Sequence, residues 1–290
     1  MRKAPVNKII KFSAVDGPGN RTAIFLQGCN FNCKYCHNPE TRALCIGCGL
    51  CVEKCPAGAL SLGTPDPAAK KGMPGYQKVP VFDPAKCVAC DTCIHVCPND
   101  ASPRIRWMNP EEVYAEVKKQ VPFIRGITVS GGECTLYPDF LTELFTLCRK
   151  DGLTCFIDSN GTYDFSTDPD LMKVTDGVML DIKAYDPVQH RDVTDADNSM
   201  VLQNALFLAK QKKLFEVRTV VVPELFDCKH TIVETGKLLA SYQPIRYKII
   251  AYRPFGVREE YRHYTSPTEE ELSVFAKELR ALGWSDIVLI

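Results

Sequence analysis

Residues 22–40, TAIFLQGCNFNCKYCHNPE, form the stretch that decides the fold. The apolar run Thr22–Gly28 is typical of a buried β-strand, and three cysteines follow it with the spacing CxxxCxxC: Cys29, Cys33 and Cys36. Three thiolates can bind three corners of a four-iron cluster and leave one iron open to a ligand, much as a catalytic zinc keeps an open position. The alternative is a cluster completed by a distant cysteine, for which Cys134 is the candidate.

Downstream of this stretch, strand-like and helical runs alternate. Further strand-like runs lie at residues 126–130, 154–158, 177–181, 215–222, 247–251 and 286–290. Helical patterns lie at 139–150, 199–212, 230–240 and 268–282, and Asn109-Pro110 marks another helix start. This alternation predicts an α/β fold with a parallel sheet and right-handed crossovers. Six or seven units are fewer than the eight of a closed barrel, so we expect a partial (β/α)6-type barrel.

Residues 41–103 interrupt this rhythm, and we expect them to form an inserted domain within a barrel made of residues 1–40 and 104–290. The insert repeats the pattern CxxCxxCxxxCP, at residues 45–56 and 87–98. In such runs three cysteines bind one [4Fe–4S] cluster, and the fourth binds the neighbouring cluster. The pattern assigns Cys45, Cys48, Cys51 and Cys97 to one cluster, and Cys87, Cys90, Cys93 and Cys55 to the other.

Two points stay open in the insert. The spacer between the runs is long and includes the Gly/Pro/Lys-rich residues Gly63–Gly75, so the exchange of the fourth ligand is expected but not required. A structural zinc site, usually built from two CxxC knuckles, is the less specific alternative.

The composition excludes several classes of protein. The chain has 290 residues, of which 35 are basic and 35 acidic, and 45% are hydrophobic. Wholesale disorder is excluded, no basic field favours nucleic acid or anionic lipid, and no run approaches the roughly 20 apolar residues of a membrane helix. The fifteen cysteines are odd in number, and no signal-peptide core precedes them. We therefore expect metal ligation in a reducing cytoplasm, without disulfides.

Polar residues follow the predicted strands, at the edge where parallel barrels carry their active sites. They lie in three motifs: Ser130-Gly131-Gly132-Glu133, Asp158-Ser159-Asn160-Gly161 and Asp181-Ile182-Lys183. Taken singly, each motif is also compatible with an ordinary turn or helix cap. Arg218 lies inside an apolar run, where a buried arginine is almost never unpaired. Either a core carboxylate neutralises it or it faces a ligand carboxylate.

CxxxCxxC with an aromatic residue, Tyr35, before the last cysteine resembles the signature of the radical S-adenosylmethionine (SAM) superfamily. The segments DGPG, GCNxxCxxCHNPE, SGGE, DSNG and MLDIK resemble the glycyl-radical enzyme activating enzymes, and the two cysteine runs resemble a bacterial two-cluster ferredoxin. Together they are most similar to the YjjW-type branch. This resemblance implies that reductive cleavage of SAM gives a 5′-deoxyadenosyl radical. That radical would abstract a Cα hydrogen from a glycine of a partner glycyl-radical enzyme.

The resemblance also implies a role for each matching residue. Cys29, Cys33 and Cys36 would ligate the catalytic cluster, and Asp16 would lie near the entry of the partner's glycine loop. Contacts to SAM or its surroundings would come from Tyr35, His37, Gly132, Glu133, Asp181, Lys183 and Arg218. Arg253 occupies a position where the family often has a histidine. Asp158, Ser159 and Met179 match positions that some members use for a monovalent cation.

The implied enzyme is a cytoplasmic monomer with three [4Fe–4S] clusters and SAM, reduced by a donor such as flavodoxin or ferredoxin. One alternative is a radical SAM enzyme that acts on a small molecule or free peptide, against which DGPG and CHNPE argue. Another is a three-cluster electron-transfer protein, which would not need the GGE motif. Cys148 in a helix, Cys155 in a strand and Cys228 in a polar loop are expected not to be ligands, whereas Cys134 could have a redox role.

Overall fold

The computed structural model of the chain describes residues 2–69 and 77–290, so residues 70–75 of the Gly63–Gly75 spacer lie outside the described residues. The chain divides into two compact units. The first contains Met1–Cys29 and Asn38–Leu153, and the second contains Asn30–His37 and Thr154–Ile290. This division passes through the predicted barrel and leaves the whole insert in the first unit. The expected domain boundaries at residues 41 and 103 stay a prediction.

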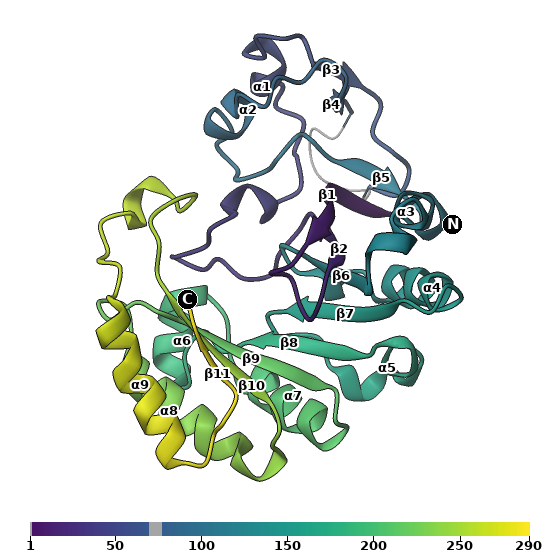
Figure 1. Cartoon of the computed structure of the whole chain (residues 1–290). Helices are drawn as coiled ribbons and strands as arrows, with labels where there is room; N and C mark the ends of the chain where they lie inside the picture. Colours follow the sequence, from purple (N-terminus) through teal and green to yellow (C-terminus); the bar gives the residue numbers. More distant parts are fainter. Residues whose placement is uncertain (1, 70–76) are drawn as a thin grey trace. The chain divides into compact units, whose positions relative to one another are not determined.

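In the first unit, four strands lie side by side in the order β5–β1–β2–β6 (Figure 1). They are β1 (Ala4–Ser13), β2 (Arg21–Leu26), β5 (Arg106–Met108) and β6 (Gly126–Gly131). β2 and β6 are parallel, as predicted, whereas β1 is antiparallel to both of its neighbours. The sequence did not predict β1. An antiparallel strand can leave part of one face in water. The lysines of β1 are exposed, and they interrupt the apolar pattern by which a strand is predicted.

Two helices follow the sequence signals closely in this unit. α3 (Pro110–Lys118) begins at Asn109. The Asn109 side chain accepts a hydrogen bond from the backbone N–H of Glu112, and the Glu112 side chain accepts one from the backbone N–H of Asn109. This capping box confirms the predicted helix start. α3 packs against α4 (Pro138–Arg149).

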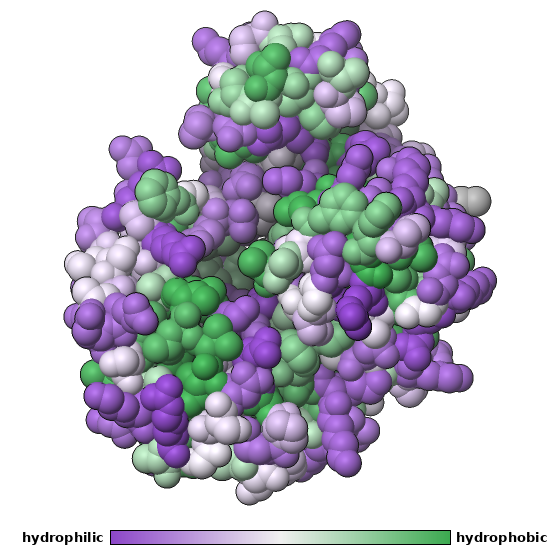
Figure 2. Space-filling model, viewed as in Figure 1, coloured by the Kyte–Doolittle hydropathy of each residue, from purple (hydrophilic) through white to green (hydrophobic). Residues whose placement is uncertain are grey.

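The insert contains short elements, as its sequence predicts. They are α1 (Leu50–Glu53), α2 (Thr92–His95) and the antiparallel hairpin of β3 (Leu60–Gly63) and β4 (Val79–Phe82). Figure 2 shows hydrophobic surface in green at the top of the view, over these elements, bordered by hydrophilic purple. The exposed apolar side chains of the insert are Ile46, Leu50, Leu62, Val81 and Val88.

The two cysteine runs repeat one another in backbone conformation as well as in sequence. Left-handed residues occur at three equivalent pairs of positions, 42 residues apart: Gly47 and Ala89, Gly49 and Asp91, Gly58 and Asp100. Glycine adopts this conformation without a steric cost, but alanine and aspartate do so only under local constraint. The second run therefore keeps the turns of the first without its glycines.

The second unit is built on five parallel strands in the order β7–β8–β9–β10–β11. All five were predicted, and their bounds are β7 (Thr154–Ser159), β8 (Gly177–Asp181), β9 (Leu214–Val221), β10 (Arg246–Ala251) and β11 (Ile287–Leu289). The predicted helices are α7 (Ser199–Lys210), α8 (Cys228–Leu239) and α9 (Glu269–Ala281), to which the structure adds α5 (Pro169–Val174) and α6 (Pro187–Thr194). Helices α7, α8 and α9 contact strands of this sheet.

The cysteines outside the motifs are buried. Cys148 lies in α4 and Cys155 in β7, as predicted. The expectation of a polar loop at Cys228 was wrong, because this residue begins α8 and is buried against the core. Within the ranges that the structure describes, no helix has both the length and the apolar character needed to cross a membrane.

Candidate functional site

The loop that carries Cys33 and Cys36 is fixed to the second unit along its length. The backbone N–H of Asn32 donates to the carbonyl of Thr194 at 2.9 Å, and that of Lys34 donates to Val193 at 3.0 Å. The Asn32 side chain also donates to the carboxylate of Asp195 at 2.7 Å. The end of α6 therefore fixes the loop at residues 32 and 34.

Two residues from the far end of the chain complete this support. Arg258 Nη2 donates to the carbonyls of Asn32 and Cys33, at 3.3 and 3.2 Å, and its side chain is only 14% exposed. Gly256, with φ of +80°, packs so closely that a Cβ atom would lie 2.3 Å from the His37 carbonyl oxygen. Sequence reasoning missed both residues, because Arg258 lies 225 positions after Cys33 and no spacing links them.

Cys29 belongs to the first unit, where the strand ends fix it. Its N–H donates to the carbonyl of Arg42 at 2.7 Å, and the N–H of Glu133 donates to the Gly28 carbonyl at 2.7 Å. A Cβ atom on Gly132 would lie 2.3 Å from the same Gly28 oxygen. The GGE glycine is therefore required for close backbone packing behind the cysteine.

Glu133 presents a buried carboxylate in the first unit. The residue is 1% exposed, and its Oε1 accepts hydrogen bonds from the backbone N–H and hydroxyl of Thr135, at 2.9 and 2.5 Å. Burial of an acid is favourable only when its charge is compensated. A carboxylate held in this way is chemically suited to accept from an ammonium group.

In the second unit, Tyr35 and His37 lie near a half-buried ion pair. Lys183 Nζ is 2.7 Å from Asp181 Oδ2 and 5.8 Å from the centroid of the Tyr35 ring. Burial disfavours the charge of Lys183, but Asp181, together with Tyr35 and Cys33, outweighs this effect and raises the lysine pKa well above its ordinary value. Burial, with Lys183 and Arg253, lowers the pKa of His37. The site thus combines a permanent ammonium with a neutral imidazole.

Two polar atoms here are ready for a ligand. Tyr35 Oη and His37 Nε2 are buried and lack a hydrogen-bond partner in the described ranges. Buried polar groups in proteins are normally satisfied. A polar ligand seated against the loop would supply the missing partners, so these residues fit the SAM molecule that the resemblance implies.

Arg218 is paired with carboxylates, the first of the two possibilities that the sequence left open. Its Nε contacts Glu216 Oε1 at 2.5 Å, its Nη1 contacts Asp158 Oδ1 at 3.0 Å, and its Nη2 lies 2.9 Å from Met179 Sδ. Burial opposes the charge, but Asp158, then Glu216, raises the pKa of Arg218 further. Glu216, which the sequence analysis missed, also lies 3.3 Å from Lys248 Nζ.

The residues matched to a monovalent cation lie beside Arg218, and their role in binding such an ion stays a prediction. Asp158 and Met179 already face the guanidinium of Arg218. The Ser159 hydroxyl accepts a hydrogen bond from the N–H of Gly161 at 2.9 Å, within the turn that ends β7. A positive charge therefore already stands beside these donors.

Arg253 and Asp16 are less buried than the residues above. Arg253 is exposed, and its contact to SAM stays a prediction. Asp16 is half-buried and hydrogen-bonded to the Ser13 hydroxyl. Its loop is fixed by the buried Arg21, which donates to the Pro18 carbonyl at 3.2 Å.

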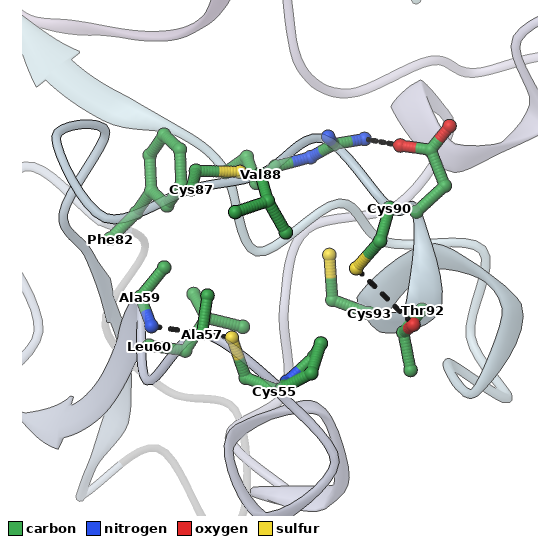
Figure 3. Close-up of a pocket in the computed structure, with 13 residues that line it drawn as sticks. Cys55, Ala57, Ala59, Leu60, Phe82, Cys87, Val88, Cys90, Thr92 and Cys93 are labelled. Carbon is green, nitrogen blue, oxygen red and sulfur yellow. Dashed lines mark hydrogen bonds and ion pairs between the residues drawn. The ribbon is translucent and has the colours of Figure 1, made fainter.

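The eight insert cysteines line two separate pockets, each with the composition that the ligand exchange predicts. Figure 3 shows one of them, with the side chains of its four cysteines around a common space. Its cysteines are Cys55, Cys87, Cys90 and Cys93, and those of the other pocket are Cys45, Cys48, Cys51 and Cys97. Four thiols per pocket match the ligand number of a cubane cluster.

The environments of these thiols differ. Burial raises the pKa of Cys51 to about 12, whereas a hydrogen bond with Thr92 lowers the pKa of the exposed Cys90. Among the described residues, no three His, Cys, Asp or Glu side chains meet closely enough to hold one metal ion. The thiolates of a cubane bind different iron atoms and need no common meeting point.

Cys134, the candidate for a distant fourth ligand, is fully buried after β6. Its Sγ lies 3.3 Å from the Val129 carbonyl oxygen, to which the thiol donates. This contact is the one expected of a small buried hydrophobic thiol.

Comparisons with known proteins show the family of the chain. The radical SAM superfamily matches residues 23–235. A protein of Haemophilus influenzae named as a glycyl-radical enzyme activating enzyme is 31% identical, over 99% of this chain and 96% of its own. The indoleacetate decarboxylase activating enzyme of Tractidigestivibacter scatoligenes is 30% identical, over 90% and 86%.

Among solved structures, SuiB of Streptococcus suis bound to S-adenosylmethionine matches 64% of this chain and 44% of its own, with a TM-score of 0.52 and 11% identity. This likeness shows the fold alone. The family match and the two relatives cover most of the chain. The chain therefore belongs to the radical SAM superfamily and, within it, to the glycyl-radical enzyme activating enzymes.

Proposed function

We propose that this chain activates a partner glycyl-radical enzyme by removing a hydrogen atom from one of its glycines. The observation that carries this proposal is the anchored CxxxCxxC loop, with two unsatisfied polar groups of the chain, Tyr35 Oη and His37 Nε2, beside it. The relatives named as activating enzymes span nearly the whole chain. SAM and the cluster, when bound, supply the radical chemistry.

The residues of the chain bind and orient these groups. Cys29, Cys33 and Cys36 would hold three irons, and the buried carboxylate of Glu133 would accept from the ammonium of SAM. Tyr35 and His37 would face the nucleoside side of the site. Lys183 keeps its proton and supplies a fixed positive charge.

Anaerobic reconstitution with iron, sulfide, SAM and a reductant tests the function. We expect 5′-deoxyadenosine by chromatography, and a glycyl signal by electron paramagnetic resonance when the correct partner enzyme is added. Formation of 5′-deoxyadenosine without a glycyl signal, across glycyl-radical enzymes encoded beside this gene, would favour a small-molecule or peptide substrate. Absence of 5′-deoxyadenosine would contradict both enzymatic hypotheses, activation of a glycyl-radical enzyme and action on a small molecule or peptide.

The insert is proposed to carry two further [4Fe–4S] clusters with exchanged fourth ligands, as in the YjjW-type branch. The grouping of the cysteines into two sets of four supports this. Cys55 comes from the first run but lies with the second, and Cys97 comes from the second but lies with the first.

Iron content in double variants tests the exchange. Cys55→Ala/Cys87→Ala removes two ligands of one proposed cluster, so about eight irons should remain from about twelve. Cys55→Ala/Cys45→Ala removes one ligand from each, so about four should remain. The reverse ranking would show that each run keeps its own fourth cysteine.

A further inference from the structure

A basic cavity in the first unit is not used by the proposed chemistry. It measures about 340 Å³ and lies between β1, the end of β4 and the start of β5. Four basic side chains and one acidic side chain line it: Lys8, Lys11, Arg104, Arg106 and Glu116. The chain as a whole has no net charge, so this concentration of positive charge is local.

The cavity directly adjoins one of the two cysteine pockets. Phe82 and Arg104 line both the cavity and the pocket of Cys55, Cys87, Cys90 and Cys93. Arg104 is also paired with Asp91, at 2.6 Å, one residue after Cys90. Cys90 is exposed. A partner seated on the basic cavity would therefore stand beside this pocket.

The other cysteine pocket is connected to Cys29. The Cys29 N–H donates to the Arg42 carbonyl, and the Arg42 guanidinium pairs with Asp100 at 3.1 Å. The Ala43 N–H donates to the Asp100 carbonyl at 3.1 Å. Ala43 lies two residues before Cys45, and Asp100 lies three residues after Cys97. The pocket of Cys45, Cys48, Cys51 and Cys97 is thus the one tied to the catalytic motif.

We propose that an acidic one-electron carrier protein docks on this basic cavity, and that electrons enter the enzyme through the Cys55/Cys87/Cys90/Cys93 site. This inference rests on the proposed function, which needs one electron for each SAM cleaved. The carrier loses one electron and the site beside the cavity gains it. The electron then passes to the Cys45/Cys48/Cys51/Cys97 site and onward to the Cys29 motif. No bond is made or broken in this transfer.

Charge decides the kind of partner. Lys8, Lys11 and Arg106 are exposed and form no ion pair with another described residue, whereas Glu116, the acidic residue that lines the cavity, is paired with Lys119 at 2.7 Å. Asp91 is paired with Arg104, and Asp83 is paired with Lys86 at 3.6 Å. Such a surface attracts an acidic protein and accelerates its association, most strongly at low ionic strength.

Stopped-flow reduction of the reconstituted holoenzyme tests the proposal, with reduced flavodoxin as the probe and the bleaching of iron–sulfur absorbance as the signal. The variant Lys8→Glu/Arg106→Glu reverses two charges at the cavity. The matched control, Lys173→Glu/Lys277→Glu, reverses two exposed lysines of the second unit. Photoreduced deazaflavin, a small uncharged reductant, serves as the partner-independent reference.

We expect the cavity variant to lower the second-order rate constant with flavodoxin by about tenfold at low salt, with the difference shrinking at high salt. The milder Lys8→Gln/Arg106→Gln should fall in between, and the control should match the parent. Deazaflavin should reduce all variants equally. Equal flavodoxin rates for the cavity variant and the control, or an equal slowing with deazaflavin, would overturn the proposal.

Failure of the docking proposal and failure of the proposed function can be told apart. If the parent protein forms no glycyl radical with any partner under deazaflavin reduction, the proposed function fails. The charge effect on flavodoxin reduction is measured without that radical and stands or falls by itself.

Discussion

The loop of Cys33 and Cys36 and the insert both carry closely spaced cysteines, but they are built differently. The loop is held by the end of α6 and by Arg258, and its neighbours include a half-buried lysine and two polar atoms that lack a hydrogen-bond partner among the described residues. The insert relies on short helices and left-handed turns, and it exposes apolar side chains such as Val88, at 66%. The difference fits the two tasks proposed above: a site that must also bind and orient a ligand, and sites that only carry electrons.

The largest expected effect is the loss of 5′-deoxyadenosine formation when a cysteine of the loop, but not one of the insert, is replaced. Cys33→Ala should abolish 5′-deoxyadenosine formation while about eight irons remain, because only the open cluster is lost. Cys93→Ala should also lose about four irons but should retain 5′-deoxyadenosine formation with a small chemical reductant. Iron analysis and product chromatography measure both. If Cys93→Ala were equally inactive with the chemical reductant, the insert would have a role beyond electron supply.

The next effect concerns the charge network of the second unit. Arg218→Met removes a guanidinium that pairs with Glu216 and Asp158, and the loss of one partner of a buried ion pair typically costs about 3–5 kcal/mol. Urea denaturation should show this loss. Arg191→Met, which removes an exposed pair with Asp197, is the control and should cost about 0–1 kcal/mol. Equal costs would mean that the Arg218 pairs are screened like surface pairs.

The sequence predicted the parallel strands well, because each is a short apolar run bounded by turn or helix signals. It failed at β1, where Lys8 and Lys11 break the pattern of an antiparallel strand that is partly in water. Short helices such as α6 were also missed. Local spacing predicted the first three cysteines of each group in the insert. The fourth, Cys55 or Cys97, comes from the other run, and only the general pattern of two-cluster runs predicted it.

The surroundings of the catalytic motif were less predictable. Arg218 was singled out because an arginine inside an apolar strand requires a partner, but Glu216, two residues earlier, was overlooked. Arg253 was chosen by its place in the family pattern and stays a prediction, and Arg258, which contacts the loop, was overlooked. Contacts across more than 200 positions depend on the path of the chain, which a single sequence does not encode in any local spacing.

Loop support gives a smaller, graded effect. Arg258→Ala removes the donor to the carbonyls of Asn32 and Cys33, and loss of such supporting contacts typically costs about 10–100-fold in metal affinity or activity. Chelator-induced loss of iron from the reconstituted protein, with 5′-deoxyadenosine formation, measures it. Arg253→Ala is the matched control at an exposed position and should change iron retention little. A larger loss of iron from Arg253→Ala would show that Arg253, rather than Arg258, supports the loop.

The smallest expected effect concerns two glycines with positive φ, one in the insert and one next to the main sheet. Gly58 in the insert has φ of +58° and Gly152 after α4 has φ of +73°, and a Cβ atom would meet nothing within 4 Å at either. Alanine at either position therefore pays only the left-handed backbone cost, about 1–2 kcal/mol. If the insert opens independently of the sheet, Gly58→Ala should lower the temperature of iron release without shifting the main unfolding transition, and Gly152→Ala should do the reverse. Absorbance and circular dichroism melts follow the two transitions, and a common shift would show that insert and sheet unfold together.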